Sequence, residues 1–147
     1  MKEFHGRVIQ AQNWTGEAIV SHQGFNTLAS CQTSALLATS KKIIVSDQNN
    51  KDLYKKNITG KALCLPETIG STTGGMVIQT IAVRSLAPKA WLFSHHIDPL
   101  AASGIILSNV WNDAGLIAID ELGDDFLDAV KSGDKITIKE DGTVIVE

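Results

Sequence analysis

Three short apolar runs alternate with two helical segments in the middle of the chain, and this alternation constrains the fold more than any other feature. The apolar runs cover residues 62–65, 90–93 and 116–120. The segments between them, 76–86 and 100–109, place apolar side chains at helical spacing. Because parallel strands need a long crossover, usually a helix, this β-α-β-α-β order predicts an α/β fold with a parallel sheet and right-handed crossovers.

The second of these helices carries one of the clearest start signals in the chain. Asp98 is suited to the N-cap position, and Pro99 to the first helical position that follows it. Gly104, inside the same helix, indicates close packing against another element. The first helix is expected to stop at Pro88, which cannot continue it.

Further elements are expected on both sides of this centre. They are strands at 4–11, 16–21 (after a turn at 12–15) and 42–46, helices at 28–38 and 124–131, and a hairpin of 135–139 with 143–146. Asp141-Gly142 provides the hairpin turn, and Gly6 indicates a bulge or a close approach. Ser and Thr crowd residues 28–38, so an extended ligand-facing loop is the alternative to a helix there.

Composition points to a globular protein with few classes of partner. The chain has 147 residues, 44% of them hydrophobic and 20% charged, which suits one domain over residues 1–147. The net charge is −3 and no Lys/Arg cluster exceeds a pair, so nucleic acid and anionic membranes are poor partner choices. No apolar run approaches the roughly 20 residues that span a bilayer, and the N-terminus lacks an apolar signal core. We therefore expect a cytoplasmic protein, with Cys31 and Cys64 as buried free thiols.

A glycine- and hydroxyl-rich loop joins the first apolar run to the first helix. It contains Gly70, Ser71, Thr72, Thr73, Gly74 and Gly75. A loop of this kind presents free backbone N–H groups and the positive end of a helix dipole at the carboxyl edge of a sheet, where anionic ligands tend to bind. The pattern is neither a Walker loop nor G-x-G-x-x-G. Thr72 or Thr73 is the expected N-cap.

Other polar residues are expected near the same edge. His95 and His96 end the neighbouring strand, and either could reach the site, although the default interpretation of each is a histidine that caps the strand or faces water. Asp120 ends the third strand, where helix capping is its default role. Asn26, with Phe25 and Thr27, is expected to line the substrate side because of its polarity. A serine such as Ser71 can act as a base only if its pKa is lowered by a metal, a positive neighbour or hydrogen bonds.

Residues 60–119 resemble the small subunit, or swivelling domain, of aconitase X. The pieces that carry the resemblance are GKALCLP, IGSTTGG and APKAWLFSHHIDPLAASGIIL. The resemblance implies a swivelling β/β/α domain with a mostly parallel central layer, helices on one side and a second β layer on the other. It also implies a larger aconitase-like partner subunit that holds most ligands of an iron or iron–sulfur centre.

The resemblance further implies a hydro-lyase that removes water from a small hydroxy acid and is inactive as an isolated subunit. Ser71 would be the catalytic base or a residue that faces the metal, while Gly70, Thr72, Thr73, Gly74, Asn26 and His95 would bind substrate. The expected substrate is cis-3-hydroxy-L-proline, and the alternative is mevalonate 5-phosphate. This chain has GFNTLASCQ where many members have a more acidic or Gly-rich segment, which leaves the substrate open.

Two other classes of function are compatible with the residues. One is a module that binds an anionic metabolite without performing chemistry. The other is a phosphohistidine-type swivelling domain in which His95 or His96 is phosphorylated. Recovery with a larger iron-containing chain would favour the dehydratase over both.

Overall fold

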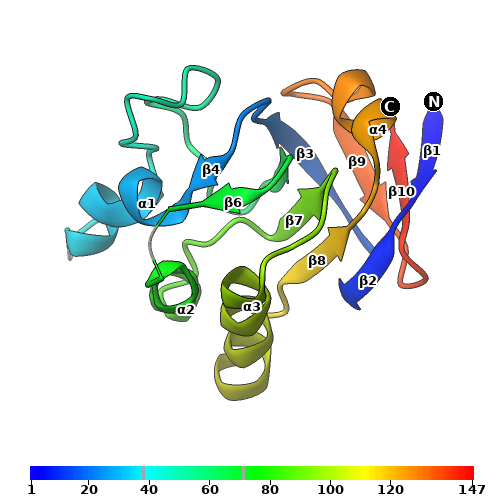
Figure 1. The fold of residues 1–147 in the computed structure, drawn as a ribbon. Coiled ribbons are helices and arrows are strands. Elements are labelled where there is room, and N and C mark those ends of the chain that lie inside the picture. The colour runs from blue at the N-terminus through cyan, green and yellow to red at the C-terminus, as the bar shows by residue number, and fades with distance from the viewer. Residues whose placement is uncertain (38, 71) are drawn as a thin grey trace.

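The computed structural model of the chain describes residues 1–37, 39–70 and 72–147, so Ser71 and Ala38 lie outside the described residues. The strands are β1 (Lys2–His5), β2 (Arg7–Gln10), β3 (Trp14–Val20), β4 (Phe25–Asn26), β5 (Ala62–Leu65), β6 (Thr68–Ile69), β7 (Ala90–Phe93), β8 (Ile117–Asp120), β9 (Lys135–Ile138) and β10 (Thr143–Val146). The helices are α1 (Thr27–Leu36), α2 (Gly74–Val83), α3 (Pro99–Asn112) and α4 (Asp124–Ala129). Figure 1 shows α1, α2 and α3 on one side of the strands, with α4 beside β9 and β10 on the other.

The predicted parallel centre is confirmed. The large sheet has the order β1-β10-β9-β3-β5-β7-β8-β2, and the β3-β5, β5-β7 and β7-β8 pairs are parallel. The predicted hairpin is also present, since β9 and β10 pair antiparallel, and β10 pairs in turn with β1. The carboxyl ends of β3, β5, β7 and β8 therefore share one edge, as the sequence argument for the site requires.

Strand β3 belongs to two layers. Its first residues, from Trp14 to Glu17, pair antiparallel with β9, whereas its last three, from Ala18 to Val20, pair parallel with β5. The β1, β10 and β9 strands thus form a second β layer that continues from the parallel layer through β3. This is the β/β/α arrangement that the resemblance implies.

Residues 4–11 do not form the single strand that was predicted. The chain breaks at Gly6, and the two halves, β1 and β2, become the opposite ends of the strand order. A Cβ on Gly6 would lie 2.5 Å from the carbonyl oxygen of Asp120, the last residue of β8, so only glycine fits at this close approach. The close approach at Gly6 is thereby confirmed, while the continuity of the strand was wrong.

The parallel layer separates two hydrophobic cores because its side chains alternate between faces. Leu63, Leu65, Trp91 and Phe93 pack under the helices α1–α3. On the other face, Ala62, Cys64, Ala90 and Leu92 pack against α4 and the second β layer. Both faces of β5 and β7 are fully buried, which explains why these strands are continuous apolar runs in the sequence.

The connection from α1 to β5, residues 37–61, differs from expectation. Residues 42–46 were predicted as a strand, but the described residues show only one isolated bridge, between Ile44 and Asn57. The apolar spacing reflects burial, since Ile43 and Val45 are almost completely enclosed in the helix-side core. The helix predicted just before this connection is confirmed as α1, so the extended-loop alternative is wrong.

Candidate functional site

The glycine-rich loop begins at a short strand beside the main sheet. After β5 the chain forms β6, which pairs in parallel with β4, so that Ile69 lies opposite Asn26. Gly70 follows with φ +99°, and a Cβ there would lie 2.6 Å from Nδ2 of Asn26. Glycine is therefore required at this position both by its backbone angle and by the contact with Asn26.

Three helix N-termini meet at a cavity of about 220 Å³ beside this loop. Thr27 is the first residue of α1, Gly74 is the first of α2, and Leu100 and Ala101 lie in the first turn of α3. The other lining residues among those described are Thr68, Ile69, Gly70 and Asp98. Because the first N–H groups of a helix lack helical acceptors and carry partial positive charge, this convergence favours a negatively charged ligand.

Asp98 is the one carboxylate in the described lining, and both of its oxygens are engaged. Oδ2 accepts a hydrogen bond of 3.0 Å from the backbone N–H of Ala101, and Oδ1 accepts from the Thr68 hydroxyl. The predicted N-cap at Asp98 and the proline after it are both confirmed. These two bonds use part of the carboxylate's capacity to accept hydrogen bonds inside the cavity.

The structure brings together part of the predicted site. Gly70 and Gly74 line the cavity, while Thr72 and Thr73 are exposed between them. Thr73 occupies the N-cap position of α2, but its side chain makes no capping hydrogen bond. The hypothesis that concerns Ser71 falls outside the described residues.

Asn26 has a structural task that sequence reasoning did not identify. Its Oδ1 accepts a 3.0 Å hydrogen bond from the backbone N–H of Ala29 and so caps α1. Its neighbour Thr27, rather than Asn26, lines the cavity. The sequence did carry this signal, since Asn is a preferred N-cap residue and stands directly before the helix.

His95 lies at the expected edge but turns away from the cavity. Its Nε2 is 2.8 Å from Oδ1 of Asp124, the first residue of α4, which packs on the opposite face of the sheet. His96 places Nδ1 3.2 Å from Nη2 of Arg7 and 3.4 Å from Oε1 of Glu121. Neither histidine lines the cavity at the start of α2.

Asp120, which is fully buried, forms an ion pair with the half-exposed side chain of Arg7. Arg7 donates from Nε and Nη2 over 2.9 and 2.6 Å, and the backbone N–H of Ile97 donates over 2.8 Å. Burial disfavours the charged carboxylate, but these hydrogen bonds and the charge of Arg7 outweigh it and lower the pKa of Asp120. Helix capping was the expected role, and the pairing with Arg7 left no signal because 113 residues separate the two.

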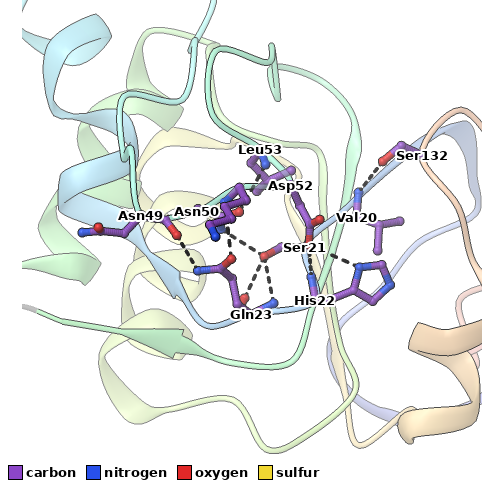
Figure 2. Close-up of polar contacts among 10 residues, drawn as sticks. Val20, Ser21, His22, Gln23, Asn49, Asn50, Asp52, Leu53 and Ser132 are labelled. Atoms are coloured by element: carbon purple, nitrogen blue, oxygen red, sulfur yellow. Dashed lines mark hydrogen bonds and ion pairs between the residues drawn. The ribbon is translucent and has the colours of Figure 1, made fainter.

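A second polar cluster holds the connection after β3 (Figure 2). Asn50 and Ser21 are both fully buried, and Nδ2 of Asn50 lies 3.0 Å from the Ser21 hydroxyl oxygen. Asp52 accepts a 2.7 Å hydrogen bond from the backbone N–H of His22. The side chain of Gln23 donates over 2.8 Å to the carbonyl of Asn49. These contacts tie residues 47–53 to the segment that leads into β4 and the cavity.

The residues around the cavity do not fit an iron–sulfur centre. Such clusters are held mainly by cysteine thiolates, whereas the described lining offers hydroxyls, main-chain groups and one engaged carboxylate. Cys31 and Cys64 are buried free thiols whose pKa values burial raises. Among the described residues, no group of three or more His, Cys, Asp or Glu side chains is arranged to hold a metal ion.

No helix in the described residues is long and apolar enough to cross a membrane.

Curated relatives include proteins named phosphomevalonate dehydratase small subunit. The one from Methanocaldococcus jannaschii is 29% identical over 92% of this chain and 90% of its own length. The one from Methanocella arvoryzae is 34% identical over 62% of each chain, so the match spans less than two thirds of that relative.

Solved structures agree with the fold. The crystal structure of Thermococcus kodakaraensis aconitase X in its holo-form matches with a TM-score of 0.83 and 27% identity, over 100% of this chain and 99% of that one. A solution structure of a UPF0107 protein matches with a TM-score of 0.78 at 22% identity, over 99% of both chains, and bears on the fold alone. A family model described as the aconitase X swivel domain matches residues 3–146, and the chain therefore belongs to the aconitase X swivel domain family.

Proposed function

We propose that this chain is the small subunit of an aconitase X-type dehydratase and that its substrate is mevalonate 5-phosphate. The observation that carries the proposal is the cavity where α1, α2 and α3 begin beside the glycine-rich loop, in a member of this family. The names of the relatives favour mevalonate 5-phosphate over cis-3-hydroxy-L-proline, the substrate first expected from the sequence. Family membership likewise favours a dehydratase over a phosphohistidine domain.

The cavity supplies a cradle for one anionic end of the substrate. Backbone N–H groups at the starts of α1 and α2 would donate to a carboxylate or phosphate oxygen, since nothing inside a helix satisfies them. In the described lining no side chain carries a positive charge. The cationic groups that balance a phosphorylated acid would therefore come from the larger partner subunit.

Ser71 is the proposed base of the reaction. In its deprotonated form its Oγ would take the proton from the carbon next to the carboxylate, and the electrons of that C–H bond would form the double bond. The hydroxyl on the neighbouring carbon would leave as hydroxide and take up a proton from solvent to become water, while Ser71 would return its own proton to solvent. Gly70 before it lines the cavity, and Thr72 after it is exposed. A serine at this task needs help from nearby positive charge or hydrogen bonds.

The larger subunit would also carry the iron or iron–sulfur centre that the family resemblance implies. The donor set around the cavity does not suit such a centre, and we assign no ligand to this chain. An active site divided between two chains would make the isolated small subunit inactive. Its location in the cytoplasm stays a prediction.

An apolar groove next to the loop is the surface we assign to the partner subunit. The groove lies between α1 and α2, has a volume of about 420 Å³, and is lined by Leu28, Gln32, Ala35, Leu36, Thr73, Met76, Val77 and Thr80. Thr73 belongs both to the groove and to the loop. Any chain that completes the site must cover the loop, so the same chain would reach the groove. Leu36 and Met76 are 76% and 69% exposed without it.

The direct test is turnover by the complex of this chain with an aconitase X large subunit. Mevalonate 5-phosphate should lose water, and Ser71→Ala should abolish turnover while the subunits still assemble. Ser103→Ala, on the exposed side of α3, is the matched control and should retain activity. If the complex turned over cis-3-hydroxy-L-proline and not mevalonate 5-phosphate, the proposed substrate would be wrong. Near-normal activity of Ser71→Ala would refute the assignment of Ser71 as the base. Tight binding of mevalonate 5-phosphate by the isolated chain without turnover by the complex would favour the binding-module alternative.

A further inference from the structure

The loop that carries Ser71 is fastened at both ends to the same helix, α3. Before the loop, the hydroxyl of Thr68 in β6 donates to Oδ1 of Asp98, the N-cap of α3. After the loop, Gly75 in the first turn of α2 packs against the backbone of α3, where a Cβ on Gly75 would lie 2.5 Å from the carbonyl oxygen of Leu100. The start of α3 is therefore a common platform for the two segments that enclose the loop.

The platform is itself fixed to the sheet. The backbone N–H of Ile97, the residue before Asp98, donates over 2.8 Å to the buried carboxylate of Asp120. Asp120 is held in turn by two hydrogen bonds from Arg7. Ile97 is almost completely buried. Hydrogen bonds thus connect β2 and β8 to Ile97, and the next residue, Asp98, is hydrogen-bonded to the strand that enters the loop.

Asp98 makes two contacts with separable purposes. The bond from the Ala101 N–H caps α3, and helix caps of this type stabilise a helix by roughly 0.5–2 kcal/mol. The bond from Thr68 has no such local purpose, because Thr68 lies 30 residues earlier in the chain and belongs to a strand of only two residues. That short strand has just one neighbouring strand, β4, in the described residues.

We propose that Thr68 and Asp98 form a clamp that positions the Ser71 loop for the dehydration reaction, so that both are positioning residues rather than catalytic ones. This rests on the proposed function for its effect on turnover, but the position of the loop can be measured without it. A displacement of about 1 Å in a reacting group can cost on the order of a hundredfold in rate. Loss of the clamp should therefore reduce kcat more than it changes KM.

The test compares Thr68→Val with Thr68→Ser. Valine matches the shape of threonine and suits a strand but cannot donate, whereas serine keeps the hydroxyl. In the complex with the large subunit, Thr68→Val should lower kcat at least about tenfold with KM within about twofold, and Thr68→Ser should restore most of the activity. Asp98→Ser is a second variant, since serine still caps α3 but is too short to reach Thr68, and it should behave like Thr68→Val.

Amide hydrogen exchange of the full chain provides the independent readout. Thr68→Val should speed exchange over residues 69–75 without changing exchange in β8. The control Thr137→Val removes another strand threonine hydroxyl, one that Thr15 contacts over 3.4 Å, and should alter neither measurement. Unchanged exchange over 69–75 would overturn the clamp, and so would faster exchange with normal kcat. A wild-type complex without dehydratase activity would refute the proposed function, while the exchange data would still decide whether the clamp exists.

Discussion

Gly75 in α2 and Gly104 in α3 pack directly against each other at the point where the two helices cross. A Cβ on Gly104 would lie 2.6 Å from the carbonyl oxygen of Gly75 and 2.7 Å from its Cα, so the two helices can approach this closely only with glycine at the crossing. The contact sets the position of the first turn of α2, which borders the cavity. The sequence indicated close packing at Gly104 but could not identify its partner.

Gly104→Ala should therefore destabilise the protein. Forcing a methyl group against backbone atoms costs about 1–3 kcal/mol, and the better helix propensity of alanine returns up to about 1 kcal/mol of that. We expect a net loss of about 1–2 kcal/mol in the free energy of unfolding, measured by urea denaturation. Gly74→Ala is the control, because its Cβ would have no neighbour nearer than 3.9 Å, and a comparable loss in that variant would contradict the explanation.

The Arg7–Asp120 pair predicts a specific dependence of stability on pH. The pKa of Asp120 is lowered from its ordinary value of 3.8, so the folded state favours the ionised carboxylate. This contribution is fully present above about pH 4 and is lost as the pH falls through the lowered pKa. Asp120→Asn should cost about 1–3 kcal/mol at pH 7, since the neutral amide replaces a buried carboxylate that accepts hydrogen bonds from Arg7 and from the backbone N–H of Ile97.

The difference between Asp120→Asn and the wild type should shrink below pH 4, where the wild-type carboxylate also becomes neutral. Urea denaturation at several pH values between 2 and 7 measures this. Glu140→Gln, which neutralises an exposed carboxylate, is the control and should leave the profile almost unchanged. A constant difference between wild type and Asp120→Asn across the whole range would show that charge is not the cause.

The central fold could be predicted because its signals are local. Buried parallel strands are continuous apolar runs, and Asp98-Pro99 marks a helix start within two residues. The division of residues 4–11 could not be predicted, since both halves suit a strand and the atoms that exclude a side chain at Gly6 belong to the distant residues Ile119, Asp120 and Leu122. The strand predicted at 42–46 failed because its backbone hydrogen bonds to residues 55–58 amount to one isolated bridge, while the burial of Ile43 and Val45 produces the apolar spacing of a strand.

The candidate site was predictable in location but not in composition. The loop at the carboxyl edge followed from the order of strand, glycine-rich turn and helix. The convergence of three helix starts depends on β4 pairing with β6, and two-residue strands leave no periodic signal. For the same reason Asp98 and Thr68 were not linked. His95 was expected near the cavity because it follows the neighbouring strand, but its side chain pairs with Asp124, 29 residues later in the chain.

The groove between α1 and α2 predicts where assembly is vulnerable. Met76→Asp places a charge in the groove yet suits the first turn of α2, where negative charge is favourable. We expect the dissociation constant of the complex with the large subunit to rise at least about tenfold, as measured by calorimetry, with the isolated chain still folded. Val110→Asp, on an equally exposed apolar residue near the end of α3, should affect assembly little. Equal weakening by both variants would indicate that the groove is not the contact surface.

Asn50 is expected to hold the connection after β3 in place (Figure 2). Its side chain is fully buried, donating to Ser21 over 3.0 Å and accepting from the backbone N–H of Leu53 over 3.1 Å. Asn50→Ala leaves that N–H without an acceptor inside the protein, which costs about 1–3 kcal/mol. Asn49→Ala is the matched control, because Asn49 is exposed and its contact with Gln23 uses the backbone carbonyl, which alanine keeps. Urea denaturation should separate the two variants by at least about 1 kcal/mol, and equal stability would mean that water replaces the lost hydrogen bond without cost.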